Sequence, residues 1–190
     1  MAFAILRAEK LKTMGNIGGS LAHNYRTIDT PNANPSQTPN NFHSLKDSEA
    51  VKAAISERLP EKRRSDAVLC VEYMITASPE WQGWNDERQN EYFKQAVDWL
   101  EQRHGKHNVV ATSIHRDETT PHLIAYVVPL DQDTGKLNAK KFLGGKAKLA
   151  EMQSSFSNHV KNLGLKRGIE GSKAKHTRIK EYYAKVNEPT

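Results

Sequence analysis

The chain has 190 residues and a net charge of +6, with 28 Lys and Arg against 22 Asp and Glu. This length suits one domain with a substantial core. The sequence contains no run of about 18 apolar residues, so it predicts no membrane-spanning segment. The basic balance favours nucleic acid as a partner, because Lys and Arg that contact phosphates release bound counterions. Cys70 is the sole cysteine, which excludes a disulfide within the chain, and we expect a cytoplasmic protein.

A glycine-rich segment, residues 14–20, comes early in the chain and predicts a turn. Ser20 is expected to cap a helix over residues 21–26. Backbone N–H groups at such a bend suit a phosphate, and Arg26 would add a charge-assisted contact to it. The alternative is an ordinary surface helix on which His23 is incidental.

The next segments alternate between loop and helix. Residues 29–45 are rich in Asn, Pro, Ser and Thr, and a loop of this length is usually either functional or without regular structure. Asp47 is expected to cap a helix that ends before Pro60. The apolar positions of residues 85–104 recur with a helical period, and Gly105 should end that helix.

Two segments in the first half of the chain predict β-strands. Residues 2–8 indicate a short first strand, and residues 66–78 are apolar on both faces, as in a central strand. Glu72 stands out in the second strand, because a carboxylate there must be paired, open to a cleft or raised in pKa. A salt bridge is the ordinary explanation. The functional one is a carboxylate near enough to an active site to orient or deprotonate a histidine.

A predicted antiparallel hairpin follows, with residues 108–114 and 123–129 as its strands around a short polar connection. His115 would end the first strand, Glu118 would lie in the connection, and His122 would open the second strand. Imidazole nitrogens and a carboxylate oxygen suit a divalent ion such as Mn²⁺, Zn²⁺ or Mg²⁺. From this tract alone, a metal site and a solvated turn both remain open.

The last quarter of the chain is basic. A helix is predicted over residues 146–163, with Gly164 after it, and a final helix passes through Tyr182 and Tyr183. Clustered lysines suit contacts with a phosphate backbone, although many such clusters are only solvated surface. The candidate DNA contacts in this region are Lys140, Lys141, Lys173, Lys175, His176 and Arg178.

Several stretches, taken together and in order, resemble the MobV family of plasmid relaxases, also called Mob/Pre plasmid mobilisation and recombination proteins. The stretches are residues 14–26, 34–41, 66–72, 115–122 and 174–176. Each motif alone is weak, but their ordered combination spans nearly the whole chain.

The resemblance implies an α+β fold of the relaxase (HUH-endonuclease-like) type, in which helices flank an antiparallel β-sheet. Residues 1–190 would form a single nicking and joining domain, without the C-terminal part that family members usually carry. The implied activity is metal-dependent, site- and strand-specific nicking and joining at a plasmid origin of transfer, for conjugative mobilisation. The partner would be oriT DNA, single-stranded or as a hairpin at the nick site, in the bacterial cytoplasm and away from the membrane.

The resemblance also implies roles for individual residues. His23 would attack the DNA and form a covalent histidine–5′-phosphate intermediate, Glu72 would activate it, and Arg26 would sit on the scissile phosphate. The implied DNA contacts outside the basic region are Asn16, Asn24, Asn34, Ser36 and Asn41.

The same resemblance makes His115, Glu118 and His122 the ligands of a divalent ion, Mn²⁺ first, with Mg²⁺ or another divalent ion as alternatives. One departure concerns the metal site. The broader superfamily has a His-hydrophobic-His motif, and Ile124 stands where its last histidine would be. Glu118 is therefore the expected source of the third protein ligand.

Three other functions remain open. Tyr25, two residues from His23, is an alternative nucleophile and would indicate a tyrosine-using rolling-circle replication initiator or a transposase-like nuclease. A non-enzymatic DNA-binding module would hold a structural ion or none. A metal-dependent hydrolase of small substrates would explain the ligands but not the basic C-terminal region.

Overall fold

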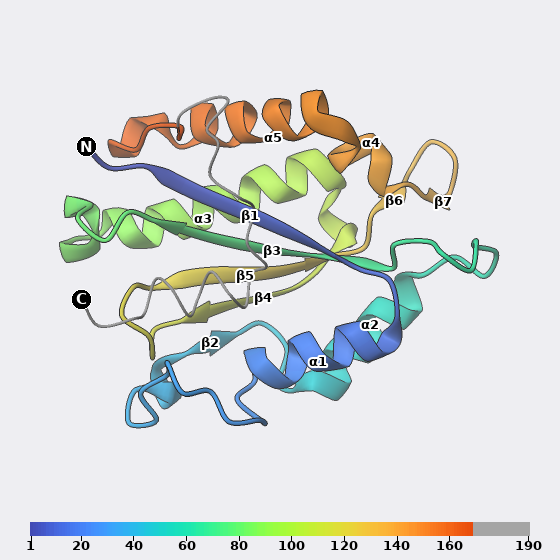
Figure 1. The fold of residues 1–190 in the computed structure, drawn as a ribbon, viewed down its shortest axis with the longest axis horizontal. Helices are drawn as coiled ribbons and strands as arrows, with labels where there is room; N and C mark the ends of the chain where they lie inside the picture. The colour runs from blue at the N-terminus through green and yellow to red at the C-terminus, as the bar shows by residue number, and fades with distance from the viewer. Residues whose placement is uncertain (169–190) are drawn as a thin grey trace.

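An antiparallel sheet of five strands lies at the centre of the molecule. The computed structural model describes residues 1–168, and its sheet has the order β1-β3-β5-β4-β2 (Figure 1). The strands are β1 (Ala4–Leu11), β2 (Phe42–His43), β3 (Cys70–Ala77), β4 (Val109–His115) and β5 (His122–Val127). A separate small hairpin is formed by β6 (Leu130–Asp131) and β7 (Lys136–Leu137).

Helices cover both faces of the sheet. Figure 1 shows α1 and α2 on one side and α3, α4 and α5 on the other. The α-helices are α1 (Met14–Asn24), α2 (Ser48–Arg58), α3 (Arg88–His104), α4 (Ala139–Leu143) and α5 (Gly145–His159). Short 3₁₀ turns are η1 (Thr38–Asn40), η2 (Gln82–Asn85), η3 (Lys106–Asn108) and η4 (Lys161–Leu163). No helix within residues 1–168 has the length and apolar character needed to cross a bilayer.

Strand β3 divides the hydrophobic core into two layers, because its side chains point alternately to opposite faces of the sheet. Tyr73 and Ile75 pack on the side of α3 and α5, whereas Cys70 and Met74 pack on the side of α1 and α2. All eight residues of β3 are buried, which confirms the predicted interior strand. Glu72 shares the parity of Cys70 and Met74, and its side chain therefore faces α1.

Most of the predicted elements are confirmed, with shifted ends. Asp47 caps α2, since its Oδ1 accepts the N–H of Ala50 at 2.8 Å. Helix α3 begins at Arg88, later than expected, because η2 occupies the residues before it. Gly105 ends α3 with a φ of 93°, a conformation that glycine adopts at no steric cost.

Two elements near the ends of the described chain also differ from their predicted bounds. Strand β1 extends to Leu11 instead of ending near residue 8, because it pairs with β3 along its whole length. The helix predicted over residues 146–163 stops at His159 and continues as η4. The predicted helix through Tyr182 and Tyr183 lies outside the described residues.

The prediction for the glycine-rich segment is wrong. Residues 14–20 form the first two turns of α1, so Ser20 lies inside the helix and does not cap it. The cap is Thr13, whose Oγ1 accepts the N–H of Asn16 at 3.0 Å. No glycine-rich bend therefore exists here to hold a phosphate.

Burial explains why this segment is helical despite its glycines. Ile17 and Leu21 are 0% exposed in the core between α1 and the sheet. Each glycine inside a helix costs roughly 1 kcal/mol relative to alanine. Burying each of these two aliphatic side chains gains about 1.5–3 kcal/mol, which offsets that cost.

This packing predicts the outcome of a substitution. Ile17→Ala should lower the free energy of unfolding by about 2–5 kcal/mol, because it leaves a cavity in the core. Met14→Ala, on the exposed side of the same helix, should change it by less than about 0.5 kcal/mol. Urea unfolding followed by circular dichroism measures both. Equal effects of the two substitutions would contradict the packing of α1.

Candidate active site

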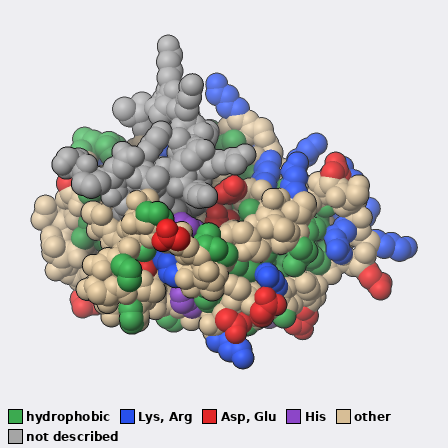
Figure 2. Space-filling view, turned by 60° about the horizontal axis from the view of Figure 1, so that its bottom comes forward, with side chains coloured by type: hydrophobic (Ala, Val, Ile, Leu, Met, Phe, Trp, Pro, Cys, Tyr) green, Lys and Arg blue, Asp and Glu red, His purple; other side chains and the backbone are tan. Residues whose placement is uncertain are grey.

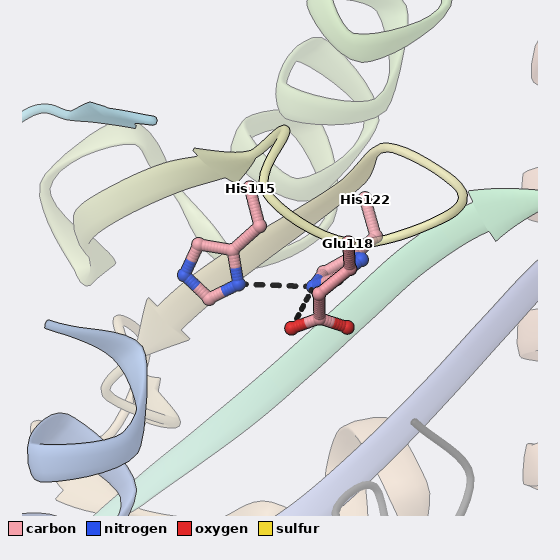
Figure 3. A group of neighbouring side chains, drawn as sticks. All are labelled: His115, Glu118 and His122. Atoms are coloured by element: carbon pink, nitrogen blue, oxygen red, sulfur yellow. Dashed lines mark hydrogen bonds and ion pairs between the residues drawn. The ribbon is translucent and has the colours of Figure 1, made fainter. Parts of the chain in front are cut away.

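The β4–β5 hairpin brings the three predicted metal ligands together. His115 and His122 lie directly opposite each other in the strand register, with Glu118 in the connection between them. Nδ1 of His115 is 2.9 Å from Nε2 of His122, and Oε1 of Glu118 is 3.8 Å from the same Nε2 (Figure 3). The three residues each offer a ligand atom within 4.8 Å of the others, and all three are buried.

Backbone carbonyls fix the tautomers of both histidines. Nε2 of His115 contacts the carbonyl oxygen of Asn24 at 3.0 Å, and Nδ1 of His122 contacts that of Thr120 at 3.2 Å. Because a carbonyl oxygen only accepts hydrogen bonds, each of these ring nitrogens must carry the proton. Burial lowers the pKa of both imidazoles and keeps them neutral.

The tautomers of His115 and His122 fit a metal ion between the two rings. In neutral rings with those tautomers, Nδ1 of His115 and Nε2 of His122 both present lone pairs, and they face each other. Outer hydrogen bonds of this kind are typical of histidine ligands, whose inner nitrogen binds the ion. Two imidazole nitrogens and a carboxylate at this spacing fit a divalent cation. Ile124, by contrast, is buried in the apolar core beside α1.

Arg26 occupies a strained position at the end of α1. The N–H of Thr27 donates to the carbonyl of Ala22 at 2.9 Å, and the N–H of Arg26 donates to that of His23 at 3.3 Å. These two bonds form a Schellman motif, in which the residue at the position of Arg26 is usually glycine. Arg26 adopts a φ of 58°, which costs an arginine roughly 1–2 kcal/mol.

The guanidinium of Arg26 holds the end of α1 against the metal-ligand hairpin. Its Nε and Nη2 donate to the two oxygens of Asp117 at 2.9 and 2.8 Å, and Nη2 also donates to Oε1 of Glu118 at 2.7 Å. Nη1 donates to the carbonyl of His23 at 2.9 Å. The guanidinium of Arg26 thus contacts protein acceptors, and its position on the scissile phosphate stays a prediction.

Glu72 is buried beneath α1 and is linked to Ser20. Oγ of Ser20 donates to Oε1 of Glu72 at 2.5 Å and lies 2.8 Å from the hydroxyl of Tyr126. Burial raises the pKa of Glu72 to about 7, against the opposing effect of the Ser20 hydrogen bond. Glu72 is thus linked by Ser20, three residues before His23, to the helix that carries His23, and its role as activator of His23 stays a prediction.

Tyr25, the alternative nucleophile, is engaged elsewhere. Its hydroxyl donates to the carbonyl of Leu45 at 2.8 Å, and its ring stacks on His43 with centroids 4.2 Å apart. Burial raises the pKa of this hydroxyl, which disfavours the phenolate that would attack phosphorus.

His43 and Asp117 are parts of the site that the sequence did not identify. Nδ1 of His43 lies 2.7 Å from Oγ of Ser113, and the ring is edge-on to His115 at 6.2 Å. Asp117 is 2% exposed, and its pairing with Arg26 holds its pKa well below the usual range. The position of Asp117 directly before Glu118 was the only local signal. His43 gave none, because its partners are distant in sequence.

The predicted DNA contacts have different environments. Asn24 is 2% exposed and its side chain donates to Ser113, and its contact with DNA stays a prediction. Asn34 accepts hydrogen bonds from Ser36 within a turn, and Asn41 accepts the N–H of Arg116.

Asn16 and Lys140 are exposed, whereas Lys141 forms an ion pair with Asp131 at 3.0 Å. The other four candidates, Lys173, Lys175, His176 and Arg178, lie outside the described residues.

Solved structures define the class of this protein. The fold is similar to the MobM relaxase domain (MOBV; Mob_Pre) bound to oriT DNA of plasmid pMV158, in a manganese-bound crystal structure. The TM-score is 0.80 at 30% identity, over 96% of this chain and 99% of that one. A second structure, of the same domain with 26 nucleotides of that DNA, gives a TM-score of 0.68 at 29% identity, over 95% and 99%. The chain therefore has the relaxase fold.

A family model gives the narrower identification. The model described as plasmid recombination enzyme (Mob_Pre) matches residues 1–184, and the chain belongs to this family. A 65 kDa protein of Zymomonas mobilis is 36% identical over 97% of this chain and 33% of its own length. A plasmid recombination enzyme of Streptococcus agalactiae is 31% identical over 96% and 39%, and a type 3 enzyme of Staphylococcus aureus is 31% identical over 98% and 48%. The chain thus spans about a third to a half of these relatives.

The ligand cluster predicts specific Mn²⁺ binding. His122→Ala should weaken the affinity for Mn²⁺ on the order of tenfold or more, because it removes one of three ligands. His107→Ala, at an exposed histidine away from the hairpin connection, should leave it unchanged. Isothermal titration calorimetry with Mn²⁺ alone measures both affinities. Equal affinities for the two variants would argue against the cluster as the metal site.

The raised pKa of Glu72 predicts a pH-dependent stability. Between its ordinary pKa of 4.5 and about 7, the folded protein keeps a proton that the unfolded chain releases, so stability falls as pH rises. Glu72→Gln removes this titration. Its stability relative to the natural protein should therefore be higher at pH 8 than at pH 4.5 by roughly 1–3 kcal/mol.

Denaturant unfolding at the two pH values measures this difference. Glu49→Gln is the control, because the side chain of Glu49 is 82% exposed on α2. A relative stability of Glu72→Gln that does not change with pH would show that folding does not raise the pKa of Glu72.

Proposed function

We propose that this chain nicks and rejoins one DNA strand at a plasmid origin of transfer, with His23 as the nucleophile, for conjugative mobilisation. One observation carries the proposal. The end of the helix that bears His23 is tied to the ligand hairpin twice. His115 contacts the carbonyl of Asn24, and Arg26, which also holds the carbonyl of His23, donates to Asp117 and Glu118 in the hairpin connection. Membership of the plasmid recombination enzyme family, and the likeness to a relaxase domain described as bound to oriT DNA, supply the substrate class.

The proposed reaction is a reversible exchange at phosphorus. A lone-pair nitrogen of neutral His23 forms a bond to phosphorus, and the bond between phosphorus and the 3′ oxygen breaks. The leaving oxygen keeps the electron pair and takes up a proton, which gives a free 3′-OH and a phosphoramidate joined to the 5′ phosphate. The remaining ring proton of His23 passes to a base. Rejoining is the reverse of these steps.

The chain provides two groups of residues for this reaction. His115, Glu118 and His122 would hold the divalent ion, Mn²⁺ first, and when bound it would supply Lewis-acid stabilisation of charge on the phosphate oxygens. Glu72 is the proposed activator of His23. Its pKa of about 7 suits proton exchange near neutral pH. Its hydrogen bond with Ser20 places the carboxylate beside the face of α1 that also carries His23.

The DNA is proposed to bind by its phosphates to basic residues and by its bases to polar ones. Figure 2 shows many Lys and Arg side chains toward one end of the molecule and others near the centre of that face, where histidines are visible. Asn16 and Lys140 are exposed and available for such contacts. Phosphate contacts would set the register of the strand, and base contacts would select the origin.

Covalent adduct formation tests the proposed nucleophile. A labelled single-stranded oligonucleotide from DNA flanking the gene is incubated with the natural protein, His23→Ala or Tyr25→Phe, in Mn²⁺ or EDTA. We expect an acid-labile, alkali-resistant adduct that His23→Ala and EDTA abolish. Tyr25→Phe should keep the rate within a few-fold, because the hydroxyl of Tyr25 is bonded to Leu45.

Circular dichroism and oligonucleotide binding serve as controls for the folding of His23→Ala. An adduct that disappears only in Tyr25→Phe would assign the chain to the tyrosine-using nucleases. Tight binding without an adduct on any DNA from the region would instead support a binding module.

A further inference from the structure

Asp117 is anchored from three sides in the connection of the β4–β5 hairpin. Its side chain is 0% exposed, and its carboxylate makes the two-point contact with Arg26 at 2.9 and 2.8 Å. Oγ1 of Thr38 donates to the same carboxylate at 2.9 Å. The N–H of Asn34 donates to the backbone carbonyl of Asp117 at 2.6 Å. Asp117 therefore has one fixed position, in which it holds the guanidinium.

Glu118 and Asp117 share the same guanidinium unequally. Arg26 donates to Glu118 through Nη2 alone, at 2.7 Å, while its paired Nε and Nη2 edge is aligned with Asp117. Two-point pairs of arginine and carboxylate are the stronger arrangement. A guanidinium released from Asp117 would find Glu118 as its nearest other carboxylate, and a two-point pair there would occupy the oxygens that a metal ion needs.

The local charge favours the same outcome. The formal charges of Arg26, Asp117 and Glu118 sum to one negative charge, which attracts a divalent cation into a buried site. Without the charge of Asp117 the sum is zero, and without that of Arg26 it is two negative charges. Loss of Asp117 should therefore weaken cation binding, and loss of Arg26 should strengthen it.

We propose that Asp117 is a positioning residue for the metal centre, which limits Arg26 to a single hydrogen bond with Glu118 and so leaves that carboxylate able to bind the metal ion. This inference rests on the proposed metal site at His115, Glu118 and His122. It assigns Arg26 two roles. The guanidinium ties the end of α1 to the hairpin, and it competes with the metal ion for Glu118 unless Asp117 is present.

A double-mutant cycle on Mn²⁺ affinity tests the proposal. Isothermal titration calorimetry with Mn²⁺ alone is performed on the full 190-residue chain, on Asp117→Asn, on Arg26→Gln and on the double variant. Asp117→Asn should weaken the affinity at least tenfold. Arg26→Gln should strengthen it at least threefold, because a competing cation is removed.

The coupling between Asp117 and Arg26 in Mn²⁺ affinity distinguishes two explanations. Either Arg26 competes with the metal ion for Glu118, or the site only loses the negative charge of Asp117. The charge lost with Asp117 is the same in both backgrounds, so it cancels in the cycle, whereas competition requires Arg26. The cost of Asp117→Asn should therefore be at least threefold smaller when Arg26 is already Gln. An equal cost in both backgrounds would overturn the proposal, because Asp117 would then act by charge or folding alone.

One further variant and one comparison within the cycle keep the test decisive. Asp131→Asn removes another buried carboxylate that pairs with a cation, Lys141, and should leave Mn²⁺ affinity unchanged. If Asp117→Asn does not fold, Arg26→Gln still decides, because general disruption of the site cannot raise the affinity. A weaker affinity in Arg26→Gln would overturn the proposal.

The outcomes also distinguish this proposal from the proposed function. A natural protein that does not bind Mn²⁺ would overturn the metal site and this inference together. A natural protein that binds Mn²⁺ and forms the DNA adduct, with Asp117→Asn binding Mn²⁺ equally well, would overturn this inference alone.

Discussion

The ion pair between Arg26 and Asp117 joins two parts of the chain that are 91 residues apart. Both side chains are almost fully buried, so either charge without the other would be strongly destabilising, by about 3–5 kcal/mol for a broken buried pair. The pair also holds Arg26 in a left-handed conformation that a glycine would adopt without strain. The end of α1, the hairpin connection and the loop around Asn34 and Thr38 all depend on this contact for their relative positions.

The carboxyl end of α1 contributes to the site through its backbone as well as through its side chains. The last carbonyls of a helix have no partner within the helix. One of them, from Asn24, accepts the hydrogen bond that sets the tautomer of His115, and another, from His23, accepts from Arg26. The protonation of the candidate metal ligand and the placement of the candidate nucleophile are thus linked by a single helix end.

The parts of the site that lie close together in sequence could be predicted, and those that depend on distant partners could not. His115, Glu118 and His122 fall within eight residues, and a hairpin brings such residues together whatever surrounds it. The contact of Arg26 with Asp117 could not be predicted, because the two residues are 91 positions apart in the sequence. The glycine-rich start of α1 was predicted as a turn, since the burial that makes it helical is a property of the assembled core.

By itself the sequence predicted the buried strand with its unusual glutamate and the hairpin that carries His115, Glu118 and His122. These depend on local spacing, because strands and helices repeat every 2 and 3.6 residues. The α+β class followed from the family resemblance, which depends on several short motifs occurring in order along the chain. The tertiary structure alone decided that Glu72 contacts Ser20, that Asn24 is buried and that the hydroxyl of Tyr25 contacts Leu45. These outcomes depend on how α1 packs on the sheet, and a local pattern does not specify which side chains meet across two packed layers.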